Sequence, residues 1–242
     1  MKRSDFTLII PSLDPDEKLA ETVKKAAEAG IDDIILVDDG SSPECRKRFR
    51  ELEALPGVTV LTHSVNKGKG AALKTAFSYF LENRKGRSGV VTADGDGQHR
   101  TEDIIACADA MQSGGHAIVL GCRDFSLPDV PKRSRFGNTL TSRVFRVFCG
   151  MNISDTQTGL RAIPTEYLPD VIEAEGSRYE YETHMLLLMG KRKIPFREVT
   201  IETVYIDANA SSHFRPVRDS LRVYGIIFKS VFRRGRKTET ER

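Results

Sequence analysis

The chain has 242 residues, a formal net charge of +3 and 39% hydrophobic residues, which is enough material for one substantial domain with its own core. It contains no apolar run approaching about 18 residues, and the apolar part of its first segment, MKRSDFTLIIPSL, is too short for a secretory signal. We therefore expect the chain to stay on the cytosolic side. The four widely spaced cysteines form no Cys-x-x-Cys pair, which argues against a zinc site and indicates reduced core thiols.

Short apolar runs alternate with helical patterns through the first half of the chain. We expect strands at 6–11, 33–41, 58–63, 88–94 and 117–123, separated by helices at 16–29, 43–55, 69–81 and 101–112. This alternation predicts an α/β fold, with a Rossmann-like, mostly parallel sheet covered by helices on both faces. The pattern is less regular after residue 123: a proline-containing loop precedes helices at 135–149 and 178–193 and a strand at 198–206.

Polar clusters follow each of the first five predicted strands. They read PSLDPDE, DDGSS, HSVNKGKG, DGDGQH and GCRDF. Ligands of open α/β sheets bind outside the carboxyl ends of the strands, so these clusters outline one binding site. Taken alone, DDGS could be a turn. NKGKG, which opens a predicted helix, could cradle a phosphate with its backbone N–H groups, although it is not a P-loop.

The segment DGDGQH at 94–99 is the most informative of these clusters. A calcium loop that starts at Asp94 would need Gly at its sixth position and Glu at its twelfth, where this chain has His99 and Ile105. The calcium-loop interpretation therefore fails. Asp94, Asp96 and Gln98 remain as hard oxygen donors on an irregular tip, which favours Mg²⁺ or Mn²⁺ bound together with substrate phosphates.

The ordered motifs IIPSLDPDE, ILVDDGSS, NKGKGAAL, DGDGQH, GCRDF and SDTQTGLRAIP resemble those of the family-two inverting glycosyltransferases. The last three look most like the dolichyl- and polyprenyl-phosphate sugar synthases. The resemblance covers about residues 6–216 and implies a GT-A-like fold. It implies a metal-dependent transfer of a hexose from a UDP- or GDP-sugar to a polyprenyl phosphate.

The resemblance also implies roles for individual residues. By the resemblance, the nucleotide is bound by Pro11, Asp39, Lys69 and Asp94. The metal ion, Mg²⁺ or Mn²⁺, is bound by Asp94, Asp96 and Gln98. Asp96 and Asp155 are the expected catalytic residues. The acceptor phosphate is expected to bind Arg123, Ser134 and Arg161. Ser134 lies in the segment PKRSRFGN, which loosely matches a basic–serine element of the family.

This chemistry needs no strong base, because a phosphate ester with a second pKa of about 6 is largely dianionic at neutral pH. The binding site of such a phosphate needs positively charged side chains. The guanidinium group of arginine suits it, because two of its N–H groups can bond two phosphate oxygens at once. Several alternatives stay open. Arg123 and Arg161 could form surface salt bridges, and Asp155 could cap a helix at TQTG. Transfer to a sugar or polyol would need a carboxylate base such as Asp155. The chain could also be a non-catalytic sugar-nucleotide-binding regulator.

The C-terminal segment is strongly basic. From Phe214 to Lys237 there are eight Lys or Arg and one acid, a local balance of 8 − 1 = +7. We expect a glycosyltransferase domain at 1–216, with a nucleotide-sugar half at 1–123 and an acceptor half at 124–216, and an amphipathic helix and tail at 217–242. The tail favours an anionic membrane surface or a membrane partner protein. No motif supports a nucleic-acid partner, so we expect peripheral association with the inner face of the membrane.

Overall fold

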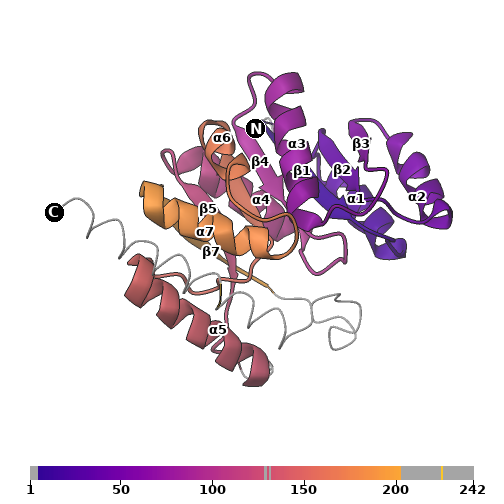
Figure 1. The fold of residues 1–242 in the computed structure, drawn as a ribbon. Coiled ribbons are helices and arrows are strands. Elements are labelled where there is room, and N and C mark those ends of the chain that lie inside the picture. The colour runs from indigo at the N-terminus through magenta and orange to yellow at the C-terminus, as the bar shows by residue number, and fades with distance from the viewer. Residues whose placement is uncertain (1–4, 128–129, 131, 203–224, 226–242) are drawn as a thin grey trace.

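The computed structural model of the protein describes residues 5–127, 130, 132–202 and 225. In this part of the chain, seven strands form one sheet (Figure 1). The strands are β1 (Phe6–Ser12), β2 (Ile34–Asp38), β3 (Val58–Thr62), β4 (Gly89–Thr92), β5 (Ile118–Arg123), β6 (Arg161–Pro164) and β7 (Phe196–Ile201). The five strands expected in the first half are confirmed to within a few residues.

The helices are α1 (Glu17–Glu28), α2 (Pro43–Glu53), α3 (Lys69–Asn83), α4 (Thr101–Ser113), α5 (Lys132–Val144), α6 (Leu168–Ile172) and α7 (Glu180–Arg192). The helix predicted at 135–149 is α5 continued by a π-helical turn, Phe145–Cys149. The sequence patterns missed β6 and α6, both of which are short. The second half of the strand predicted at 198–206 and, apart from Gly225, the amphipathic segment at 217–242 lie outside the described residues.

The strand order β3-β2-β1-β4-β6-β5-β7 places the polar clusters on one edge of the sheet. Of the described strands, β6 alone runs antiparallel to its neighbours β4 and β5, while the other pairs are parallel. The carboxyl ends of the parallel strands therefore meet the beginning of β6. In register, Arg161 of β6 lies opposite Thr92 of β4 and Leu120 of β5. The DTQTGLR motif thus reaches the same edge as DGDGQH.

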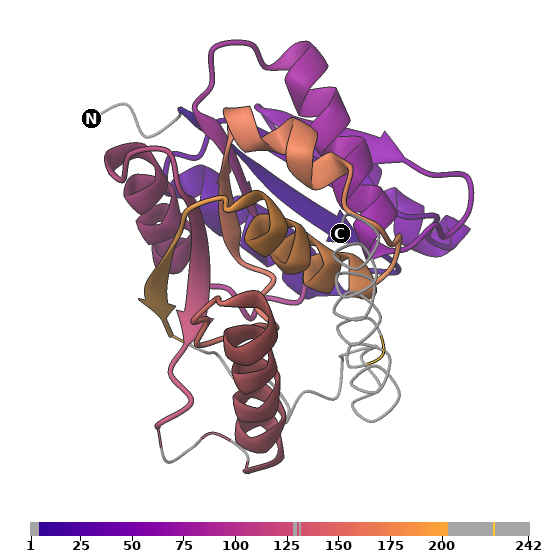
Figure 2. The same cartoon turned by 60° about the vertical axis from the view of Figure 1, so that its left-hand side comes forward.

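Alternating side chains divide the core into two layers. Leu8 and Ile10 of β1 pack on one face of the sheet with α1, α2 and α4, whereas Ile9 packs on the other face with α3, α6 and α7 (Figure 1). Figure 2 shows α5 projecting from these layers beyond the end of β5. Within the described residues, every helix is too short or too polar to span a bilayer.

Two glycines make a matched stability test. A Cβ at Gly89 in β4 would collide with the carbonyl oxygen of Ile163 in the neighbouring strand, whereas a Cβ at Gly137 in α5 would meet open space. We expect Gly89→Ala to lower the free energy of unfolding by roughly 1–3 kcal/mol through overpacking. Gly137→Ala should instead raise it by roughly 0.5–1 kcal/mol, because alanine is the better helix former. Urea denaturation measures both, and equal effects would contradict this account of the β4–β6 contact.

Candidate active site

The carboxyl edge of the sheet gathers the residues that the sequence singled out. Asp39 follows β2, Asp94 follows β4, Arg123 ends β5 and Arg161 begins β6. Lys69 begins α3, which packs on the same edge after β3. The site is therefore assembled from turns whose positions the strands fix.

Asp39 is buried and organises the loop before α3. Its carboxylate accepts hydrogen bonds from the backbone N–H groups of Lys67 (3.0 Å) and Gly68 (2.7 Å) and pairs with His63 Nδ1 (2.7 Å). The other ring nitrogen of His63 contacts the hydroxyl of Thr75 at 3.0 Å. Two amides of NKGKG are therefore already bonded within the protein, and the phosphate cradle suggested for the rest of this segment stays a prediction.

The glycines of NKGKG instead allow close packing. Gly68 has φ of +100°, and a Cβ there would collide with Ser177 and Arg178. A Cβ at Gly70 would collide with the Tyr181 side chain of α7. These two glycines bring the beginning of α3 against the beginning of α7, which places α7 over the site.

Lys69 binds two carboxylates in the centre of the site. Its Nζ lies 2.6 Å from Asp94 Oδ1 and 3.0 Å from Glu182 Oε1, and its side chain is mostly buried. Burial alone would lower the pKa of Lys69, but the charges of Asp94 and Glu182 raise it above its ordinary value. Burial alone would raise the pKa of Asp94, but Lys69, with help from His99, holds that pKa well below its usual range.

The loop after β4 offers oxygen donors beside this ion pair. Asp96 Oδ1 accepts a hydrogen bond from the backbone N–H of Gln98 at 3.0 Å. Burial and the nearby charge of Asp94 raise the pKa of Asp96. Two neighbouring carboxylates, one of them destabilised as an anion, suit a divalent cation, which would relieve their repulsion.

Asp94, Asp96 and Gln98 therefore fit Mg²⁺ or Mn²⁺ by the chemistry of their donor groups. Within the described residues, no three His, Cys, Asp or Glu side chains gather into a metal site of their own. Such a cation would accordingly depend on ligands beyond the protein, such as water and substrate phosphates. The nearby imidazole of His99 has Nε2 at 3.5 Å from Asp94 Oδ2, and its buried Nδ1 has no hydrogen-bond partner among the described residues.

Arg123 and Asp155 form a bidentate ion pair at the end of β5. Arg123 Nε donates to Asp155 Oδ2 at 2.7 Å, and Nη2 donates to Oδ1 at 3.1 Å. Asp155 is fully buried and also accepts the backbone N–H groups of Arg123 (3.3 Å) and Gln157 (3.0 Å). No helix begins at Asp155 in the structure, so the helix-cap alternative for TQTG is wrong. The guanidinium also lies 5.1 Å from the ring of Phe125.

Arg161 requires a correction. We expected its guanidinium on an acceptor phosphate or in a surface salt bridge, but the residue is 1% exposed. Nε donates to the carbonyl of Thr158 (3.1 Å), and Nη1 donates to the carbonyl of Glu182 (3.0 Å) and contacts Met185 Sδ (3.2 Å). Its Nη2 is buried and has no hydrogen-bond partner among the described residues. The antiparallel course of β6 turns this side chain under α7, which a linear motif does not show.

The other predicted residues occupy varied surroundings. Pro11 is buried in β1, in register with Val37 of β2, and Ser134 lies partly exposed in the first turn of α5. His184 is a half-buried residue of α7, and burial lowers its pKa. The structure does not test the ligands that we assigned to Pro11 and Ser134, and these assignments stay predictions.

Two residues of the site escaped the sequence analysis. Glu182, in the first turn of α7, was not among the predicted site residues, but it binds Lys69. Gly159 stands in the quoted DTQTGLR motif, and a Cβ there would press on Asp94 Oδ2 and Lys69 Nζ. A glycine inside a polar motif was the available signal, although its contact partners lie far away in sequence.

The Lys69 ion pairs predict a pH-dependent stability. Because Lys69 lowers the pKa of Asp94, the stability that this pair adds is present above the ordinary aspartate pKa of about 3.9 and declines as the pH falls below it. We expect Lys69→Met to lower the free energy of unfolding by about 1.5–3 kcal/mol at pH 7, and by less at pH 3. Lys47→Met, which removes an exposed pairing with Glu51 (3.7 Å), should change little. Urea denaturation at both pH values checks this, and a loss that grows on acidification would contradict it.

Two curated relatives align with most of this chain. The UDP-N-acetylglucosamine–dolichyl-phosphate N-acetylglucosaminyltransferase of Methanococcus voltae is 29% identical over 217 residues, which cover 83% of this chain and 86% of that protein. The polyprenol monophosphomannose synthase of Mycolicibacterium smegmatis is 29% identical over 170 residues, which cover 68% of this chain and 63% of the relative.

The fold is also found in solved structures. One is the glucosyl-3-phosphoglycerate synthase of Mycobacterium tuberculosis in complex with Mn²⁺, UDP and glucosyl-3-phosphoglycerate. It superimposes with a TM-score of 0.69 at 14% identity, covering 93% of this chain and 79% of that one. Residues 7–172, more than half of the chain, match the family described as Glycosyl transferase family 2. This chain therefore belongs to glycosyl transferase family 2 and is a glycosyltransferase with a GT-A fold.

Proposed function

We propose that this glycosyltransferase moves a hexose from a UDP- or GDP-sugar to a polyprenyl phosphate, with inversion at the anomeric carbon, at the cytosolic face of the membrane. Two relatives that align with most of the chain are named for transfer to dolichyl phosphate and for synthesis of a polyprenol monophosphomannose. Their names support the acceptor class. The sugar and the base of the nucleotide stay open.

The donor is assigned to the half of the site built by β1, β2 and β4. We propose that Asp39 and Pro11 lie at the nucleoside, while Lys69 and Asp94 lie near the diphosphate. Asp94, Asp96 and Gln98 would hold Mg²⁺ or Mn²⁺. When bound, this ion acts as a Lewis acid that neutralises negative charge on the departing diphosphate. The raised pKa of Asp96 indicates a carboxylate that gains from such a cation.

The ion pair of Arg123 and Asp155 is the observation that carries the acceptor assignment. Both carboxylate oxygens of Asp155 accept hydrogen bonds from Arg123, and the residue is fully buried. Asp155 is thus poorly suited to take a proton from a hydroxyl acceptor, which disfavours the sugar or polyol alternative. We propose that Asp155 instead positions Arg123 for the acceptor phosphate. In this interpretation Asp155 is a positioning residue, and Arg161 holds α7 in place from below.

The reaction then balances without a protein base. An oxygen of the dianionic acceptor phosphate forms the bond to the anomeric carbon, and the bond from that carbon to the nucleotide diphosphate breaks. The diphosphate leaves with the electron pair, and no proton passes to the protein. Arg123, with Ser134 near the beginning of α5, would hold the attacking phosphate through charge-assisted hydrogen bonds.

A donor and acceptor panel tests the proposal. Purified protein is incubated with labelled UDP-glucose, UDP-galactose, UDP-N-acetylglucosamine or GDP-mannose, each with farnesyl phosphate or with farnesol. We expect organic-phase label from one donor and from the phosphate acceptor only. Label on farnesol at a comparable rate would overturn the phosphate assignment, and so would label found only on sugars or polyols added as competitors.

Asp96→Asn tests the carboxylate that we place on the metal. The amide keeps the shape of the side chain but loses its charge, so transfer should fall roughly 10²-fold or more while the melting temperature is kept. EDTA should abolish the wild-type activity. Asp109→Asn, the same change at an exposed position of α4, serves as the control and should stay active. Full activity of Asp96→Asn would remove this residue from the mechanism.

Arg123→Lys tests the acceptor site. Lysine keeps the positive charge but loses the planar fork, so the KM for farnesyl phosphate should rise about tenfold while calorimetric UDP or GDP binding changes little. The control is Arg192→Lys, in the last turn of α7, where arginine pairs with Asp170 and Glu173 on the surface. An unchanged acceptor KM together with weaker nucleotide binding would show that Arg123 serves the donor.

A further inference from the structure

Helix α5 has one face held firmly by the rest of the protein. Asn138, Thr141 and Phe145 are spaced by three and four residues and are all buried. The side chain of Asn138 donates to the carbonyl of Ser154 and accepts from the backbone N–H of Thr156 at 3.2 Å. Since Ser154 and Thr156 flank Asp155, α5 is fixed directly to the segment that holds Arg123.

The opposite face of α5 carries large apolar side chains in solvent. Phe136 is 72% exposed, Leu140 39% and Val147, in the π-helical turn, 73%. Phe136 and Leu140 are spaced by four residues, which places them on one side of α5, opposite Asn138. Val147 follows seven residues later, in the π-helical turn that continues the helix. Single exposed apolar residues are ordinary, but an aligned group of this kind marks an interaction surface. We call Phe136, Leu140 and Val147 the apolar stripe.

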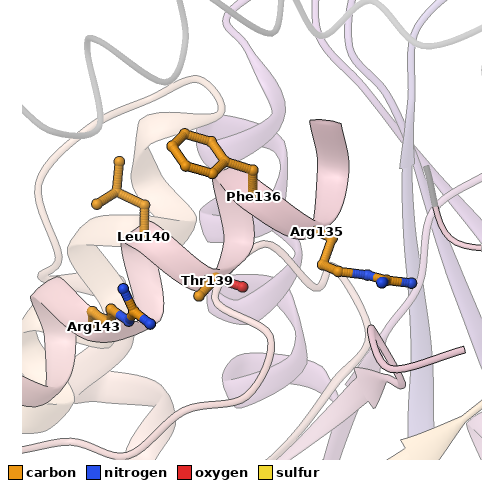
Figure 3. Close-up of a pocket in the computed structure, with 5 residues that line it drawn as sticks. All are labelled: Arg135, Phe136, Thr139, Leu140 and Arg143. Atoms are coloured by element: carbon orange, nitrogen blue, oxygen red, sulfur yellow. The ribbon is translucent and has the colours of Figure 1, made fainter. Parts of the chain in front are cut away.

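Positive charge accompanies the stripe. Residues 132–149 contain five Lys or Arg and no Asp or Glu, a local charge of +5. Arg143 is spaced by three and four residues from Leu140 and Val147 and so lies on the same side. Figure 3 shows Phe136 and Leu140 standing out from α5 with Arg135 and Arg143 on either side of them, where they border a hollow together with Thr139.

We propose that this face of α5 docks the enzyme onto an anionic lipid surface. A helix that lies in a membrane interface buries an apolar stripe at the headgroup boundary and surrounds it with cations that attract anionic lipids. The absence of any acid over 18 residues favours such a uniformly negative surface over a protein partner, whose charges are mixed. Docking would present the end of β5, with Arg123 and Asp155, to the bilayer. This last consequence rests on the proposed lipid phosphate acceptor.

Flotation of the full chain with vesicles tests the proposal. The double variant Phe136→Ser/Val147→Ser removes the apolar contact and should weaken binding to phosphatidylcholine vesicles that contain phosphatidylglycerol at least tenfold. Arg143→Glu should weaken it severalfold, and less so at high salt. The control is Val65→Ser, which should leave binding unchanged. Val65 is 63% exposed and follows β3, the outermost strand on the side of the sheet far from β5.

The outcomes separate this inference from the proposed function. Transfer to farnesyl phosphate free in solution should be equal in the wild type and the double variant, since neither changed residue touches the site. Lack of wild-type binding to anionic vesicles, or binding that the double variant retains in full, would overturn the docking surface while leaving the function intact. Loss of self-association in the double variant with unchanged vesicle binding would also overturn it, because the stripe would then join two copies of the chain. Loss of farnesyl phosphate turnover in every protein, with vesicle binding kept, would instead count against the function.

Discussion

The ion pairs of Lys69 hold the site together. One ammonium group joins the beginning of α3, the loop after β4 and the first turn of α7, through Asp94 and Glu182. Asp94 and Asp96 concentrate negative charge in the loop after β4, and their carboxylates would repel each other without compensation. Lys69 supplies this compensation within the chain itself. Gly159 allows Lys69 to approach Asp94, because a side chain at position 159 would press on both Lys69 and Asp94.

The direction of β6 explains why the DTQTGLR motif, late in the sequence, reaches the edge of the sheet where the polar clusters of the first four strands meet. A parallel strand between β4 and β5 would put its first residue at the far edge of the sheet. Because β6 is antiparallel to both neighbours, Arg161 starts at the carboxyl edge, and the turn before it carries Asp155 to the end of β5. The hydroxyl of Thr92 donates to the Gly159 carbonyl at 2.8 Å, which fixes this turn beside Asp94.

Much of this arrangement could be predicted from the sequence, because buried parallel strands read as continuous apolar runs and the polar clusters after them must share one edge. The positions of Asp39, Asp94 and Arg123 at strand ends follow from that rule. The burial of Arg161 could not be predicted in this way, because a charged side chain is normally expected at the surface. It is buried because its guanidinium donates to the carbonyls of Thr158 and Glu182, and the sequence does not show these contacts. Strand β6 has only four residues, which is too few to show the alternation of apolar and polar side chains that identifies a strand. The partners of Lys69 and Arg123 depend on contacts across the sheet that local patterns do not contain.

The hydrogen bonding of Asp155 connects the chemistry to the orientation of the molecule. Because both oxygens of Asp155 are bonded to Arg123, the acceptor in the proposed reaction has to bring its own negative charge, which a lipid phosphate does and a hydroxyl does not. The acceptor that we propose is a lipid confined to a bilayer, and in that case the end of β5 would face the bilayer. The residues on either side of Asp155 are bonded to Asn138 of α5, whose outer face is apolar and basic. In this proposal the same short segment positions both Arg123, which would receive the phosphate, and the helix that would meet the membrane.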